Sequence, residues 1–84
     1  SGLLMADFHI KALERARAGD WDGSHDLVQD YSDEFSCLIH GYLHRVEGDE
    51  FNARYWYTQA GIAMPVNSLE QELARLESLV RGHG

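Results

Sequence analysis

The sequence holds a single cysteine, a single proline and no long apolar run, and each scarcity excludes a class of protein. With Cys37 alone, the chain cannot form an internal disulfide, which fits a reducing cytoplasm. No apolar stretch approaches the roughly 20 residues that a membrane-spanning helix needs, and no segment has the pattern of a signal peptide. The sequence therefore predicts a cytoplasmic protein without a membrane partner.

Basic residues are scarce as well. Seven Lys and Arg residues stand against 14 Asp and Glu residues, and the formal net charge is −7. None of the cations lies between residues 18 and 44. A negative field of this kind repels phosphate backbones, so nucleic acid is not expected as a partner. It can attract a basic partner or a cation, or it can serve only as a solvated acidic surface. The carboxylates of this span are Asp20, Asp22, Asp26, Asp30, Asp33 and Glu34.

Helical periodicity runs through most of the chain. The 84 residues suffice for one domain, residues 1–84, with a modest core. Apolar spacing and breakers predict five helices joined by short links, which favour antiparallel neighbours. The predicted fold is all-α, a stack of antiparallel helical hairpins whose last helix caps the open end. The helices are expected at about 5–18, from near Trp21, and at about 33–47, 50–60 and 68–81.

The chain also repeats itself weakly. Gly19-Asp20 and Gly48-Asp49 lie 29 residues apart, each between two predicted helices, which is typical of stacked helix pairs. The repeat-like units are placed at about 5–33 and 34–66. The second unit holds a pattern of small and aromatic residues, a Gly-Asp turn and a closing proline: Gly41, Gly48-Asp49, Ala53, Tyr57, Ala60 and Pro65. With these residues it resembles a tetratricopeptide repeat, and its run 53–61 also resembles the related Sel1-type repeat. This resemblance implies the fold and, at most, a binding role.

The second unit departs from the repeat pattern at Cys37, His40 and His44, where the family usually has tryptophan, leucine and tyrosine. These residues stand at i, i+3 and i+7, so they share one face of a helix, with Glu47 at its edge. A thiolate and two imidazoles on one face can bind zinc, with His25 of the preceding helix as a fourth ligand or with water as a nucleophile there. Alternatively, they form a hydrogen-bonded polar seam in the core. No catalytic residue is assigned.

An aromatic group lies on the helix predicted at 50–60. Phe51, Tyr55, Trp56 and Tyr57 cannot all face one core, so at least one is expected at the surface or at an interface. Tyrosine, tryptophan and arginine dominate binding hot spots, whereas repeat packing would instead bury two faces of this helix. The interaction surface is predicted at Trp21, Arg54, Tyr55 and Trp56.

Two functions remain open from the sequence. The favoured one is a non-enzymatic module that binds a protein or peptide, either as a monomer or as a homodimer. The alternative is a metal- or small-ligand-binding protein, with hydrolytic activity included, that uses the Cys/His cluster. Zinc is the one cofactor considered for it. Zinc content of the purified protein separates the two functions.

Overall fold

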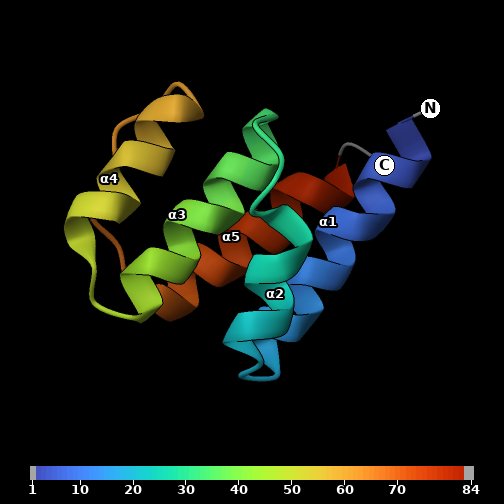
Figure 1. Cartoon of the computed structure of the whole chain (residues 1–84), viewed down its shortest axis with the longest axis horizontal. Helices are drawn as coiled ribbons and strands as arrows, with labels where there is room; N and C mark the ends of the chain where they lie inside the picture. The colour runs from blue at the N-terminus through green and yellow to red at the C-terminus, as the bar shows by residue number, and fades with distance from the viewer. Residues whose placement is uncertain (1, 83–84) are drawn as a thin grey trace.

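The computed structural model describes residues 2–82, and the side chains of residues 7–82. Within that range the chain is all-α, as predicted, with five helices and no strand (Figure 1). The bounds predicted for the last three helices agree to within one residue, whereas the first helix begins earlier than expected. The helices are α1 (Gly2–Arg17), α2 (Trp21–Val28), α3 (Glu34–Val46), α4 (Glu50–Gln59) and α5 (Leu69–Gly82).

The two Gly-Asp turns share one backbone conformation. Gly19 and Gly48 both have φ of +84°, a value that costs glycine little and strains other residues. Asp20 and Asp49 follow with φ/ψ of −90/77° and −94/79°, and each caps the next helix by accepting a backbone N–H bond. The 29-residue offset in the sequence is therefore matched by two equivalent turns.

The helix starts follow their capping signals. Asp33 caps α3 by accepting from the N–H of Ser36. At α5 a capping box formed by Ser68 and Gln71 is present in both directions. The N–H of Gln71 donates to Ser68 Oγ at 3.1 Å, and the N–H of Ser68 donates to Gln71 Oε1 at 3.0 Å. These caps satisfy backbone donors that a helix start otherwise leaves without partners.

The helices form two hairpins, α1–α2 and α3–α4, with α5 lying across them (Figure 1). The last helix was expected to cap the stack. It contacts α1 and α3, and it covers the side that these two helices form. Its buried residues Leu73, Leu76 and Val80 join the core cluster there. None of the described helices is both long and apolar enough to cross a membrane.

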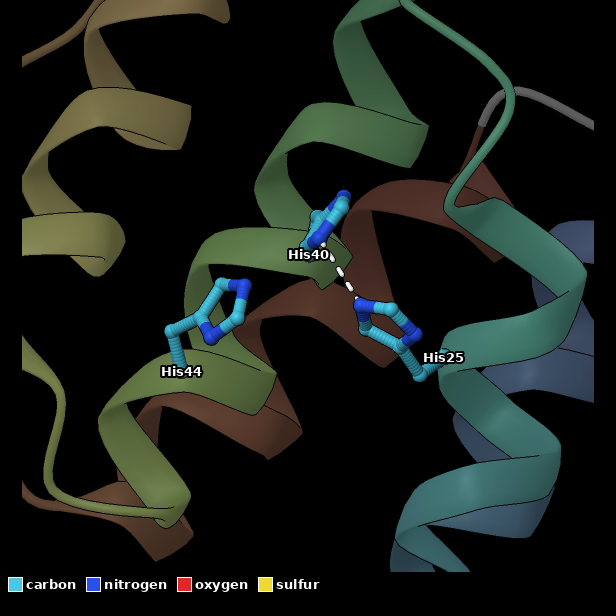
Figure 2. Close-up of side chains that lie close together, drawn as sticks. All are labelled: His25, His40 and His44. Carbon is cyan, nitrogen blue, oxygen red and sulfur yellow. Dashed lines mark hydrogen bonds between the residues drawn. The ribbon is translucent and has the colours of Figure 1, made fainter.

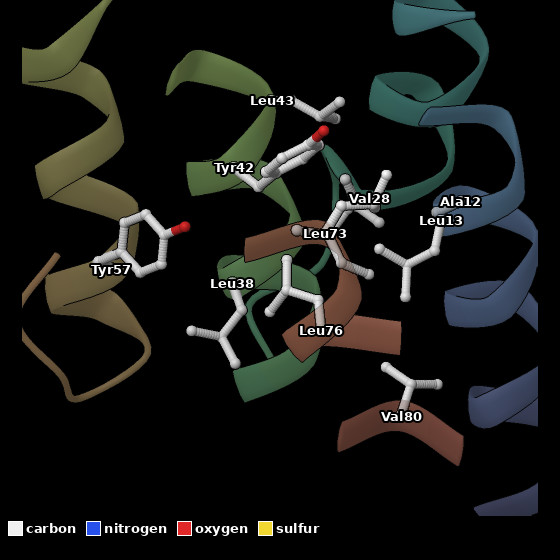
Figure 3. Packing of buried hydrophobic residues seen from close by; sticks show 11 residues of the cluster. Ala12, Leu13, Val28, Leu38, Tyr42, Leu43, Tyr57, Leu73, Leu76 and Val80 are labelled. Atoms are coloured by element: carbon white, nitrogen blue, oxygen red, sulfur yellow. The ribbon is translucent and has the colours of Figure 1, made fainter. Parts of the chain in front are cut away.

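The core centres on α3, whose residues 36–43 are all buried. Gly41 allows α4 to approach closely, because a Cβ at this position would lie 2.9 Å from the Tyr57 ring and 3.3 Å from the Ala53 carbonyl oxygen. Figure 3 shows side chains from all five helices in one cluster. Its members are Ala12, Leu13, Val28, Leu38, Ile39, Tyr42, Leu43, Tyr57, Leu73, Leu76 and Val80.

A carboxylate also lies inside the core. Glu72 lies on α5, and its side chain is fully buried. Tyr57 donates its hydroxyl to Glu72 Oε2 at 2.7 Å, Asn67 donates to Oε1 at 2.9 Å, and Arg75 donates to both oxygens at 2.8 Å. These bonds tie α4, the segment before α5 and α5 itself together, and they satisfy the buried charge.

Candidate metal centre

Three histidines converge between α2 and α3. His25 extends from α2, and His40 and His44 lie one turn apart on the facing side of α3 (Figure 2). The Nε2 atoms of His25 and His40 are 3.1 Å apart. One ring nitrogen from each of the three imidazoles lies within 4.8 Å of the others. The residues that the sequence singled out on two different helices therefore meet in space.

Two tryptophans hold the cluster from either side. Trp21 stacks on His25, with ring centroids 4.7 Å apart and an 11° angle between planes. Trp56 of α4 stacks on His40 at 3.9 Å and 12°. Trp21 also donates its indole N–H to the Leu43 carbonyl at 2.7 Å, which anchors α2 to α3. The two indoles limit how far the imidazoles can rotate.

The centre of the cluster is poorly solvated. His40 is 4% exposed, His25 is half-buried, and 12% of the His44 side chain is exposed. Burial, together with positive charge on His25 and His44, lowers the pKa of His40 to about 4. His40 is therefore neutral at pH 7, which is the form that binds metals. Its Nδ1 is buried without a hydrogen-bond partner, an uncommon state for a purely structural side chain.

Glu47 completes the edge of the cluster, where the sequence placed it. Its Oε1 lies 2.6 Å from Nδ1 of His44. The other ring nitrogen, Nε2, is therefore the one that could bind a metal ion. A carboxylate bonded to one nitrogen of a histidine fixes the ring and raises the basicity of the other nitrogen. Metal-ligating histidines commonly have such a partner.

The structure does not bring Cys37 into this cluster. Its side chain is fully buried. Among the described residues, its sulfur is not one of the ligand atoms that lie close to the three histidines. Burial raises the pKa of the Cys37 thiol, and the negative charge of Asp33 raises it further. The thiol therefore stays protonated and is a poor ligand. The four-ligand set expected from the sequence is reduced to three histidines.

No protein-family model, curated protein or solved structure matches this chain. What the protein does must therefore be inferred from its own residues. The three-histidine cluster is the strongest concentration of chemistry that the described residues offer.

The predicted interaction surface divides into two parts. Trp21 and Trp56 are half-buried and contact the histidines, so they belong to the cluster. Arg54 and Tyr55 are exposed on the outer side of α4, and Tyr55 is 51% exposed. The expectation that at least one aromatic of α4 reaches the surface is confirmed.

Sequence reasoning missed a second polar cluster, around His9. This ring is 2% exposed, and its Nε2 lies 2.8 Å from Asp33 Oδ2 and 3.1 Å from Ser36 Oγ. Ser36 donates its hydroxyl to Asp33 Oδ1 at 2.7 Å. The spacing of Asp33 and Ser36 is an N-cap signal, but nothing in the sequence aligns His9 of α1 with it. The group joins α1 to the start of α3.

Proposed function

We propose that the protein binds a divalent transition-metal ion through His25, His40 and His44. The observation that carries this proposal is the convergence of one ring nitrogen from each histidine within 4.8 Å. The Nε2 atoms of His25 and His40 lie 3.1 Å apart. Nitrogens that bind zinc tetrahedrally at about 2.0–2.1 Å lie about 3.3 Å from one another. The His25 and His40 pair already has nearly this separation. The remaining distances need to shrink by at most about 1.5 Å.

The ligand types favour zinc among the common cations. Imidazole nitrogens suit zinc, copper and nickel, whereas magnesium and calcium prefer oxygen. The net charge of −7 raises the local concentration of any cation. Three protein ligands leave a fourth position for water or a small ligand, the pattern of catalytic zinc sites. Hydrolysis by a zinc-bound water is the activity that such a site would support.

Zinc titration of the metal-free protein by isothermal calorimetry tests the proposal. We expect one zinc ion per chain, and a higher unfolding temperature when zinc is present, because zinc binds the folded state. His25→Gln and His44→Gln each remove one ligand at a partly exposed position, so the fold should survive. Each should weaken binding by about 100-fold or more, beyond the effect typical of outer-shell changes. Glu47→Gln should weaken binding by about 10–100-fold.

Cys37→Ala is the matched control, because it removes the one thiol of the chain from a position outside the cluster. We expect it to leave affinity and stoichiometry unchanged. The proposal would be contradicted if the wild-type protein bound no zinc. Equal binding by wild type and His25→Gln/His44→Gln protein would contradict it as well, because the metal would then lie elsewhere.

We also propose that α1–α4 is a pair of tetratricopeptide-like hairpins with a role in protein interaction. The two equivalent Gly-Asp turns and the close approach of α4 to Gly41 support this relationship. The side formed by α1 and α3 is occupied by α5, so a peptide has no access there. Solvent-exposed Phe51 and Tyr55 favour the outer side of α4 for such a role. If Phe51→Ala/Tyr55→Ala protein captured every partner that the wild type binds, this assignment would be wrong.

A further inference from the structure

The outer side of α4 carries aromatic surface that the fold does not use. The backbone of α4 lies close to that of α3 and of no other described helix. Ala53 and Tyr57 point inward and are fully buried. Phe51 and Tyr55, one turn apart on the opposite side, are 82% and 51% exposed. Isolated apolar residues are common on surfaces, but a paired aromatic stripe marks an interface.

Grooves adjoin this stripe where α4 meets the segment that leads into α5. Two neighbouring depressions have volumes of about 430 and 380 Å³, and Arg54, Met64 and Val66 line both of them. Val66 is fully exposed and Met64 is half-buried. The side chain of another molecule therefore finds both apolar and polar walls beside the stripe, with Met64 and Val66 next to Arg54.

The charges around the stripe are self-complementary. Glu50 and Arg54 are one turn apart on α4, and their side chains are 68% and 64% exposed. Their mutual contact is long, at 3.4 Å. In a two-fold arrangement with antiparallel α4 helices, each Glu50 faces the other copy's Arg54, and the two aromatic pairs meet between them. The net charge of −7 makes two copies repel each other, and paired Glu50 and Arg54 charges offset part of that repulsion at this side.

We propose that two copies of this chain associate through antiparallel α4 helices, with Phe51 and Tyr55 at the centre of the interface. An aromatic side chain buries about 150–250 Å², and Phe51 and Tyr55 are 82% and 51% exposed, so together they contribute about 200–330 Å² per copy. A standard interface buries about 800 Å² per partner. The dimer is therefore weak and depends on protein concentration. It does not require the metal centre, since none of its residues belongs to the histidine cluster.

Sedimentation equilibrium from about 1 μM to about 1 mM tests the dimer, because this range spans weak association. We expect the mass to rise from monomer to dimer in this range, with or without EDTA. Phe51→Ala should shift the midpoint at least 10-fold upward. Tyr31→Ala is the control, because Tyr31 is also 51% exposed but lies between α2 and α3, outside α4. Circular dichroism should show that both variants keep their helices.

Charge exchange gives the sharper test. Glu50→Arg places like charges across the two-fold, and so does Arg54→Glu, so each variant alone should remain monomeric. An equimolar mixture of the two should dimerise, because opposite charges then face each other. A monomer mass for the wild type at every concentration overturns the proposal, even if the same face captures another protein. A mixture that stays monomeric also overturns the antiparallel α4 arrangement.

Discussion

Gly41 shows how one missing side chain decides the distance between two helices. The ring of Tyr57 occupies the space that a Cβ would need, with the nearest ring carbons 2.9 Å from the ideal Cβ position. Real Cβ contacts are longer, so the ring or the whole of α4 would have to move. Tyr57 cannot move freely, because its hydroxyl donates to the buried Glu72. The strain would therefore spread to the polar network of α5.

We expect Gly41→Ala to lower the free energy of unfolding by about 1–3 kcal/mol, the usual cost of overpacking a core. This loss outweighs the roughly 1 kcal/mol that alanine gains over glycine inside a helix. Gly82→Ala is the control, because a Cβ there meets nothing within 4 Å. Urea unfolding of both variants measures the difference. A Gly41→Ala protein as stable as the control would show that α4 shifts without cost.

Helical geometry explains why the histidines could be predicted and the cysteine could not. Each residue turns an α-helix by about 100°, which places His44 about 40° and Cys37 about 60° from His40. Judged by these angles alone, all three residues share one face of the helix. However, Cys37 and His44 differ by only about 20° in this angle, so the angle does not separate them; Cys37 lies about 10 Å from His44 along the helix axis and has a short side chain. Sequence spacing gives the face of one helix, but the position of its neighbours decides which residues of that face meet.

At the scale of the elements, local signals predicted most of the structure. Glycine ends, aspartate caps and the start of α5 at Ser68 placed the bounds of the last three helices to within one residue. The burial of Glu72 was missed, because its partners Tyr57 and Asn67 lie outside α5 and periodicity carries no information about them. Local signals describe one helix at a time, and polar groups buried between helices escape them.

The aspartate caps should differ in their contribution to stability. Asp49→Ala removes the cap of α4 and should cost about 1 kcal/mol. Asp33→Ala removes the cap of α3 and also leaves the buried His9 without its carboxylate partner. We expect this variant to lose about 1–3 kcal/mol more, the cost of an unsatisfied buried polar group. Guanidinium unfolding of both proteins at pH 7 compares them. Equal losses would mean that His9 finds another acceptor.

For the whole molecule, the position of α5 was the feature hardest to predict. Its leucine stripe indicated a buried helix, but the sequence could not say which of several apolar surfaces it covers. The structure places it across α1 and α3, where Arg17 of α1 donates to both carboxylate oxygens of Glu77. This exposed pair contributes little to stability, so apolar burial holds the helix in place.

Buried carboxylates should make the whole fold sensitive to acid. Burial alone would raise the pKa of Glu72, but hydrogen bonds from Arg75, Asn67 and Tyr57 outweigh it and lower the pKa below its usual 4.5. The pKa of Asp33 is also lowered, because hydrogen bonds from Ser36 and the charge of His9 outweigh burial. A carboxyl whose pKa is lower in the folded state stabilises the fold above its unfolded-state pKa. That contribution is lost as pH falls through the folded-state value.

We therefore expect the free energy of unfolding to fall as pH drops below about 4.5, the ordinary pKa of glutamate. Urea unfolding at a series of pH values between neutrality and this acid range measures the slope. Glu72→Gln removes one of the responsible groups, so its stability should depend less on pH over the acid range, although it is less stable at pH 7. An unchanged slope in this variant would assign the acid sensitivity to other carboxylates.

The stacking of Trp21 and Trp56 on the histidines has a practical consequence. They are the only two tryptophans of the chain, and each lies face to face with a different imidazole of the cluster. Their fluorescence therefore reports on the electronic state of those rings, without any added label. A paramagnetic ion such as copper(II) bound between the histidines would quench both indoles together. The protein thus carries its own optical probe, placed on two sides of the site it would monitor.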